Sequence, residues 1–250
     1  NHVQKGASEL AQEAIKRSVE VSPMLILRQK KLAILAHSNQ DVKTALEAQR
    51  KVVKLGRYSC YGTDEDQIHF VRILAEAIET STELSQNMVL EANSILEDIR
   101  RSYVNSNPCK VAQADYLQSR MLSAQGDKEQ SKRCLERGEQ SLAPEDSTID
   151  VEVDHVCALQ GLGFTQKVGA LLARLQELYV DDQLALERLD DFLDEPVSDN
   201  NKAFVAEVNR EGIALYSKGA FNEALHCFDR AIAQFPRHVG LQLNVIQTLL

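Results

Sequence analysis

The chain has 250 residues, of which 44% are hydrophobic and 26% are charged, and its formal net charge at neutral pH is −9. This acidity argues against general binding to nucleic acids or anionic membranes, and no apolar run approaches the roughly 18 residues of a membrane-spanning helix. Five prolines and eleven glycines are too few for a turn-rich β protein, whereas good helix formers dominate. The composition therefore predicts an all-α fold.

The first predicted hairpin of helices lies within residues 25–54. Mostly small or apolar side chains, with one glutamine, occupy the intervals of two packed helices there: Ala33, Ala36, Val42, Ala45, Gln49 and Val52. Between the helices, Gln40 is predicted to occupy the turn, with Asn39 beside it to tolerate the turn conformation. Residues 1–62 hold eleven Lys or Arg against five Asp or Glu, a net charge of +6 (11 − 5), so this end of the chain is basic.

A second hairpin of this kind is predicted around Gly126. The same intervals are occupied there by Leu122, Gly126, Ser131, Leu135 and Gly138, with Pro144 as the stop. Other segments have helical periodicity without a repeat signature: Asp64–Thr80, Glu83–Tyr103, Thr148–Leu159, Gln166–Tyr179 and Gln183–Leu193. Ser22 and Asn107 each precede a proline and are predicted helix N-caps.

The segment from Asp181 to Asp199 is acidic, with eight carboxylates and one arginine. It ends in polar residues that predict a linker at 194–200. We therefore expect a degenerate helical array over 1–193, this acidic linker, and a clear repeat over 201–250. A calcium-binding role for the acidic run is disfavoured because no Asp-x-Asp-x-Asp-Gly loop occurs.

The last fifty residues carry the clearest pattern. Small and bulky residues alternate at hairpin intervals: Gly212, Leu215, Gly219, Phe221, Ala224, Phe228, Ala231 and Pro236. The spacing predicts helices over Asn201–Lys218 and Ala220–Gln234, with Gly219 at the turn and Pro236 as the stop. Gly212 and Ala224 are expected to form the close crossing. Leu215, Phe221 and Phe228 are expected to fill the groove around it.

This pattern closely resembles a tetratricopeptide repeat, which spaces Gly, Tyr, Ala, Phe and Pro in the same way over about 34 residues. Val208, Glu211 and Leu215 depart from the residues usual at their positions. The residues after Pro236, HVGLQLNVIQTLL, read as the first helix of a further repeat, and the chain is expected to be part of a longer protein. The resemblance implies a right-handed α-solenoid of antiparallel helix hairpins whose first helices line a groove for a peptide or a partner's helix.

The repeat pattern also predicts which residues face that groove: Asn209, Ile213 and Tyr216 in the clear repeat, Gln113, Tyr116 and Arg120 around Gly126, and Lys30, Ile34 and His37 in the first hairpin. Tyr116 and Arg120 are the favoured pair, because exposed Tyr and Arg often contribute about 2 kcal/mol or more each to an interface. The alternative is that Tyr116 packs between helices. No position reproduces the Lys–Asn pair of chaperone-tail adaptors, which disfavours that role.

The sequence contains no motif for catalysis, cofactor binding or metal binding. It lacks a phosphate-binding glycine loop, a His-Glu-x-x-His motif and a Gly-x-Ser-x-Gly motif. The five cysteines are scattered, without a Cys-x-x-Cys pair, which favours a reducing cytoplasm over a disulfide scaffold. We therefore expect a cytoplasmic protein that is not an enzyme and needs no cofactor.

The region Val52–Ala77, following a degenerate hairpin, is similar to the output region of some bacterial response regulators, in which a repeat array follows a receiver domain. This resemblance implies a non-catalytic protein-interaction scaffold in two-component signal transduction, with a receiver domain upstream. A general assembly or chaperone-like adaptor is the first alternative. The second is a nucleic-acid-binding α-solenoid that uses the basic hairpin residues Lys30, Lys31, Lys51 and Arg57.

Overall fold

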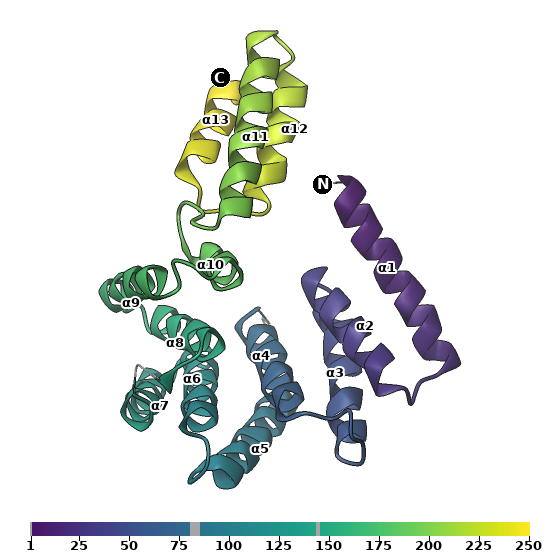
Figure 1. The fold of residues 1–250 in the computed structure, drawn as a ribbon, viewed down its shortest axis with the longest axis vertical. Helices are drawn as coiled ribbons and strands as arrows, with labels where there is room; N and C mark the ends of the chain where they lie inside the picture. Colours follow the sequence, from purple (N-terminus) through teal and green to yellow (C-terminus); the bar gives the residue numbers. More distant parts are fainter. Residues whose placement is uncertain (1, 81–85, 144–145) are drawn as a thin grey trace. The chain divides into compact units, whose positions relative to one another are not determined.

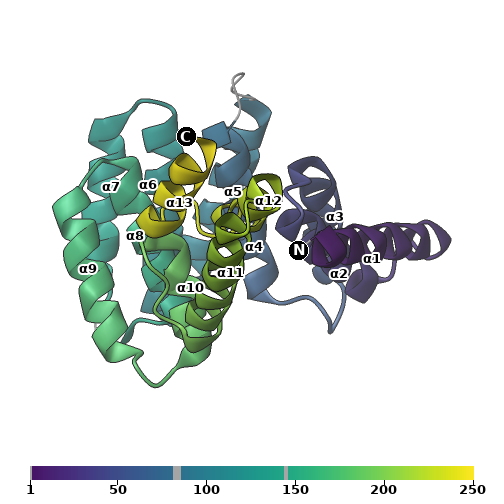
Figure 2. The same cartoon turned by 90° about the horizontal axis from the view of Figure 1, so that it is seen from above.

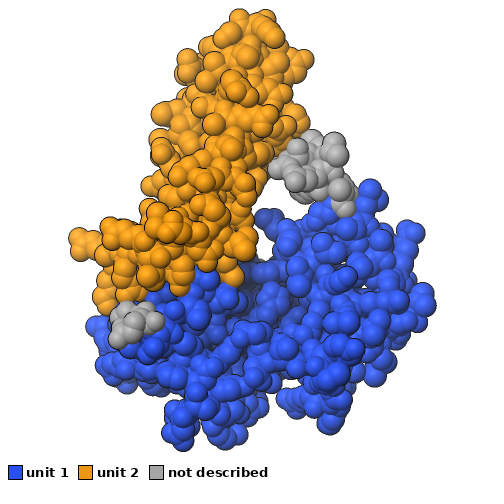
Figure 3. Space-filling model, in the orientation of Figure 1, with its two compact units in different colours: residues 1–164 blue, residues 165–250 orange. Residues whose placement is uncertain are grey.

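The computed structural model describes residues 2–80, 86–143 and 146–250. Over these residues it contains thirteen α-helices and no strand, which confirms the all-α prediction. The chain divides into two compact units, Asn1–Phe164 and Thr165–Leu250 (Figure 3). The segment 194–200, expected as a linker, lies within the second unit.

The first unit consists of consecutive helices that pack in pairs (Figure 1). They are α1 (His2–Val21), α2 (Ile26–Ser38), α3 (Val42–Gly56), α4 (Asp64–Thr80), α5 (Gln86–Tyr103), α6 (Pro108–Ala124), α7 (Lys128–Ser141) and α8 (Ile149–Gly161). The pairs α2/α3, α4/α5 and α6/α7 pack together, and the second helix of each pair also contacts the first helix of the next. Figure 2 shows α2 beside α3 and α6 beside α7 from a second direction. In addition, α6 contacts both α4 and α8.

The predicted element bounds are close to the observed ones. The Asp64–Thr80 segment is α4, and α5 begins at Gln86, while residues 83–85 of its predicted start lie outside the described residues, as does the stop at Pro144. Asn107 caps α6 by accepting a hydrogen bond from the Lys110 amide. The cap predicted at Ser22 is wrong, because α2 begins later, at Ile26.

The same turn conformation connects α2 to α3 and α6 to α7. In the second unit it also connects α11 (Asp199–Ser217) to α12 (Phe221–Ile232). The turn residues Gln40, Gly126 and Gly219 have φ of 61°, 85° and 76°. The next amide donates to a carbonyl five residues earlier, at 2.8–3.0 Å, which is the hydrogen bond of a Schellman motif. The turn predicted at Gln40 is therefore confirmed. The same turn, with Gly163 at φ 76°, ends α8.

The first unit has its largest core cluster where α4, α5 and α6 meet. The cluster is formed by Ile68, Phe70, Val71, Leu74, Ala75, Ile78, Ala92, Leu96, Ile99, Ala114, Leu117 and Met121. The α2/α3 pair is held by smaller side chains: Ala33, Ala36, Ala45 and Val52 are fully buried, and Gln49 nearly so. These small residues let the two helix backbones approach closely.

The second unit contains α9 (Thr165–Leu178), α10 (Gln183–Leu189), the 3-10 helix η2 (Asp190–Phe192), α11, α12 and α13 (Val239–Leu249). Its core forms between α11, α12 and α13. The buried Asp190 carboxylate accepts hydrogen bonds from the Val197 amide at 2.6 Å and the Ser198 hydroxyl at 2.5 Å. These contacts fix the 194–200 segment to the preceding helical turn.

The crossing of α11 and α12 differs in detail from the prediction. A Cβ at Gly212 would lie 2.4 Å from the Phe228 ring, so the contact that requires glycine is with Phe228, whereas Ala224 is fully buried in the core beside it. Phe221 does not fill the groove as predicted. It is 51% exposed, because it is the first residue of α12 and lies edge-on to Tyr216.

None of the described helices is long and apolar enough to cross a membrane. All five cysteines are free thiols. The described residues also contain no group of three or more His, Cys, Asp or Glu side chains that could hold a metal ion.

The strained turn at Gln40 generates a stability prediction. A non-glycine residue at positive φ costs about 1–2 kcal/mol, partly offset because glycine is more flexible when unfolded. Gln40→Gly should therefore raise the free energy of unfolding by roughly 0.5–1 kcal/mol in urea denaturation. Gly126→Gln is the matched control and should lower it, because a Cβ there meets nothing within 4 Å and only the backbone conformation is strained. A loss of stability in Gln40→Gly would contradict this account.

The close contact at Gly212 generates a second prediction. Gly212→Ala should lower the free energy of unfolding by about 1–3 kcal/mol, because the Phe228 ring must move. Gly169 in α9 is also helical, and a Cβ there meets nothing within 4 Å. Gly169→Ala should consequently stabilise by about 0.5–1 kcal/mol through helix propensity. Thermal unfolding of both variants tests the difference, and equal effects would refute the packing role of Gly212.

Candidate partner-binding face of the first unit

Ion pairs join α2 to α4 along one side of the first unit. Lys30 Nζ lies 2.8 Å from Asp66 Oδ2, and His37 Nε2 lies 2.7 Å from Glu76 Oε2. Lys30 and His37 are seven residues apart, so they lie on the same side of α2. Ile34 lies between them and is 56% exposed. The three residues predicted to face a groove from α2 therefore share one face, on which only Ile34 is free of polar partners.

The same face continues from α4 to α6. Lys110 on α6 pairs with Glu65 on α4. About three helical turns further along α6, Arg120 donates from Nε and Nη2 to the Glu79 carboxylate on α4 at 3.0 and 2.8 Å. In both pairs the cation is the more buried partner and the carboxylate the more exposed one.

The face ends on α8, where Asp154 is almost wholly buried. Arg72 on α4 donates to its two oxygens at 2.8–3.1 Å, and Gln113 on α6 donates to Oδ2 at 2.9 Å. Arg72 also donates to the Asp150 carbonyl at 3.1 Å. Burial opposes the charge on Arg72, but the Asp154 carboxylate outweighs it and raises the arginine pKa. The predicted groove residue Gln113 thus connects helices and is 2% exposed. We call the surface defined by these pairs, from Lys30 to Asp154, the ion-pair face.

Tyr116 and Arg120 do not project from this face as predicted. Tyr116 is 3% exposed and Arg120 is 8% exposed. The Tyr116 ring stacks on the His155 ring, with centroids 4.5 Å apart, and lies so close to Gly138 that a Cβ there would be 2.6 Å from it. The alternative, in which Tyr116 packs between helices, is therefore the one observed. Arg120 is buried because its carboxylate partner is on the neighbouring helix.

Two histidines and a glutamate cluster between α2 and α4. The rings of His37 and His69 meet edge to face, with centroids 5.6 Å apart. His69 Nε2 is buried without a hydrogen-bond partner among the described residues. Burial, followed by the nearby charges of His37 and Arg72, lowers the pKa of His69 to about 4, whereas the hydrogen bond to Glu76 raises the pKa of His37. At neutral pH the buried His69 ring is therefore neutral.

A second buried carboxylate, Asp115 on α6, joins α5 and α7. Arg100 Nε donates to Oδ1 at 2.7 Å, and Arg137 Nε donates to Oδ2 at 2.8 Å. Asp115 is fully buried. None of Arg72, Asp115 and Asp154 was predicted as a functional residue from the sequence. They could have been recognised as charged residues at helix positions where the periodicity expects an apolar side chain, as for Arg72 between Val71 and Ile73.

The predicted groove residues of the second unit lie along α11. Asn209 Oδ1 accepts a hydrogen bond from Asn244 Nδ2 on α13 at 2.5 Å. Ile213 is 49% exposed, and Tyr216 is half-buried with its ring edge-on to Phe221, at a centroid distance of 5.3 Å. These three side chains provide one polar contact between helices and an accessible apolar position.

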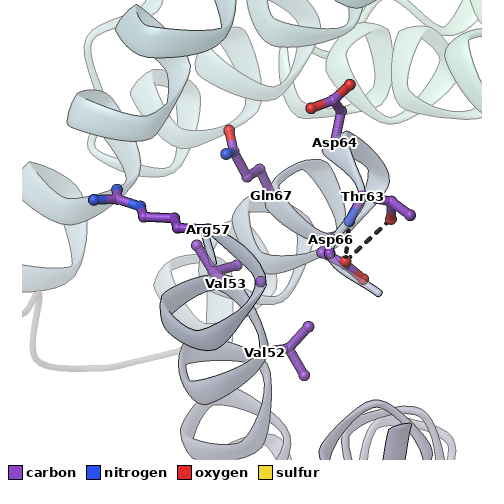
Figure 4. Close-up of a pocket in the computed structure, with 9 residues that line it drawn as sticks. Val52, Val53, Arg57, Thr63, Asp64, Asp66 and Gln67 are labelled. Atoms are coloured by element: carbon purple, nitrogen blue, oxygen red, sulfur yellow. Dashed lines mark hydrogen bonds between the residues drawn. The ribbon is translucent and has the colours of Figure 1, made fainter. Parts of the chain in front are cut away.

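A cleft of about 130 Å³ lies where α3 ends and α4 begins (Figure 4). Asp66 Oδ2 there accepts hydrogen bonds from the Thr63 amide at 2.8 Å and the Thr63 hydroxyl at 3.0 Å, which caps α4. The side chain of Arg57 points away from these groups and from Asp64. The cleft is therefore part of a helix start, with its acidic groups already engaged.

Cys157 on α8 interacts electrostatically with Arg120 of the ion-pair face. Burial raises the pKa of Cys157 to about 11, so the thiol stays protonated at neutral pH.

Comparison with protein-family models, with curated proteins and with solved structures finds no match to this chain.

The His69 environment predicts acid sensitivity. Its folded-state pKa lies below the ordinary value of 6.5, so the unfolded chain takes up the proton first, and stability is lost as pH falls from about 6.5 to about 4. The raised pKa of His37 acts oppositely, since its contribution is present below 6.5 and is lost as pH rises through the folded-state pKa. We expect the His69 contribution to fall by about 2 kcal/mol between pH 7 and pH 5.

Urea denaturation of the parent and His69→Asn at both pH values measures this contribution, because the variant should lose about 2 kcal/mol less. Proton NMR titration of the histidine rings provides an independent check. A His69 pKa near 6.5 would contradict the burial that the structure describes.

Proposed function

We propose that the chain is a non-catalytic protein-interaction scaffold built from tetratricopeptide-like helix hairpins in a right-handed solenoid. The observation that carries this proposal is the repeated packing scheme of the first unit. Each pair uses its second helix to contact the next pair, and α6 contacts both α4 and α8. First helices that meet directly can present side chains from several hairpins to one ligand.

The exposed groups of the ion-pair face define the kind of contact that we propose. Lys110 and Arg120 are more buried than their carboxylate partners, while Glu76 and Glu79 are more accessible and Ile34 is half exposed. Ile34 replaces Tyr116 and Arg120 as the residue that we assign to direct partner contact. An accessible apolar side chain within a rim of charged groups is a common arrangement in protein interfaces.

Function within bacterial two-component signalling, as the output region of a response regulator, is a further proposal that rests on the resemblance of Val52–Ala77 alone. Its test is the upstream reading frame, which should encode a receiver domain. Absence of that domain would leave the general assembly adaptor as the proposed role. The free cysteines are consistent with the cytoplasmic location that either role requires.

The binding role is tested by affinity capture from host lysate, followed by titration calorimetry with the purified captured protein. Ile34→Glu on α2 should weaken binding at least tenfold, because it places a charge at the contact and costs more than about 1.4 kcal/mol. Leu90→Glu is the matched control, since Leu90 is 66% exposed on α5, a second helix of its pair. Circular dichroism should show equal helicity in both variants. Equal binding by Ile34→Glu and the parent would remove the ion-pair face as the binding surface.

A further inference from the structure

One side of α3 faces away from the helices on which it packs. Its buried residues, Ala45, Ala48, Gln49 and Val52, lie on the opposite side. The outward side carries Lys43, Glu47, Arg50, Lys51 and Lys54, and the chain continues from it into Arg57 and Tyr58. We call this set the α3 ridge. By helix rise it extends over about 21 Å from Lys43 to Arg57.

Four cations of the α3 ridge have no ionic partner among the described residues. Lys43, Lys51, Lys54 and Arg57 are exposed, and none forms an ion pair with any residue that the structure describes. This contrasts with Lys30, Arg72, Lys110 and Arg120, each of which is paired with a carboxylate. The exposed position of Lys54 is explained by the favourable interaction of a cation with the C-terminus of its helix. Lys43 and Lys51 lie before the last turn of α3, so this interaction does not explain them.

The remaining charges near the ridge are few. Glu47 is the one acidic residue on the outward side of α3, and Arg50 is held at the edge by a pair of hydrogen bonds to Glu91, at 2.7–2.8 Å. Asp64 lies beyond the end of α3, and the Arg57 side chain points away from it (Figure 4). The unpaired cations therefore outnumber the accessible carboxylates on this surface.

Two tyrosines extend from the same end of α3. Tyr58 is 91% exposed and Tyr61 is 53% exposed. Aromatic rings are rarely left so accessible without a ligand or partner, because their burial is strongly favourable. Tyr58 directly follows Arg57 in the chain, and both side chains are exposed.

We propose that the α3 ridge binds single-stranded nucleic acid, with its lysines and Arg57 on the phosphates and with Tyr58 and Tyr61 stacked on bases. Basic side chains that follow a backbone, combined with exposed aromatic rings, are what binding of single strands requires. A purely acidic protein segment would match the cations but would give the two tyrosines no stacking partner. This inference concerns a different surface from the ion-pair face and does not depend on the proposed scaffold function.

The acidity of the whole chain does not prevent such binding. At physiological ionic strength the screening length is about 8 Å, so a bound phosphate responds chiefly to charges of the ridge itself. The sequence-based hypothesis of nucleic-acid binding included Lys30, but that side chain is engaged by Asp66. Of that set we retain Lys51 and Arg57, and we add Lys43 and Lys54, which are exposed on the same side of α3.

Fluorescence anisotropy with a labelled oligothymidylate at several salt concentrations tests the proposal. With about four phosphates neutralised, the slope of log K against log salt should be near −3. The triple variant Lys51→Gln/Lys54→Gln/Arg57→Gln should bind at least about tenfold more weakly, with a slope near −1. Tyr58→Ala should weaken binding about fivefold or more while leaving the slope unchanged, because it removes stacking but no charge.

The matched control is Lys128→Gln/Lys132→Gln/Arg133→Gln on α7, which makes the same change in net charge at exposed positions. It should bind the oligonucleotide like the parent. Equal weakening by the two triple variants, or no binding by the parent at low salt, would overturn the proposal. Tighter binding of a polyglutamate peptide than of the oligonucleotide would overturn it in favour of an acidic protein partner. Should the α3 triple variant lose helicity, Lys51→Gln and Tyr58→Ala alone still give a decisive result.

Discussion

An ionised carboxylate buried between helices must be met by donors from the neighbouring helices, and this constraint organises the first unit. Asp154 accepts hydrogen bonds from Arg72 and Gln113 on two other helices. Asp115 accepts hydrogen bonds from Arg100 and Arg137 in the same way. Leaving either carboxylate unpaired in the interior would cost about 3–5 kcal/mol. Because the donors come from different helices, sliding one helix along its neighbour would break several charged hydrogen bonds together. The apolar core alone would tolerate such a shift more easily.

The same requirement explains the accessible chemistry of the ion-pair face. The cations that join these helices are no longer accessible to a ligand, because Arg120 and Lys110 are paired with carboxylates and are more buried than those partners. The face is left with partly exposed glutamates around Ile34. The α3 ridge is different because, among the described residues, only its Arg50 is paired with a carboxylate from another helix, whereas Lys43, Lys51, Lys54 and Arg57 are not. A basic residue thus stabilises the fold where a carboxylate of another helix reaches it, as for Arg100 and Arg137, and stays available to a ligand where none does.

Hairpin turns and capping could be predicted from local sequence. A turn residue at positive φ is required wherever a helix reverses into its partner, and Gln40, Gly126 and Gly219 occupy such positions. Glycine adopts that conformation without strain, and the repeat spacing was sufficient to place even the glutamine. Asn107 before Pro108 was likewise identified as a cap from adjacent residues alone. These features depend on a few consecutive residues and can therefore be predicted without knowledge of the tertiary structure.

By itself, the sequence determined that the chain is helical, where its main hairpins turn and which helix sides are apolar, because periodicity and backbone preference are local properties. Only the tertiary structure decided which individual polar side chains are buried and which partners they have. Tyr116 and Arg120 have a spacing that fits an open groove, yet both are buried, because His155, Gly138 and Glu79 reach them from other helices. Burial and charge pairing depend on residues distant in the chain. Helical periodicity shows which way a side chain points, but not what the fold brings against it.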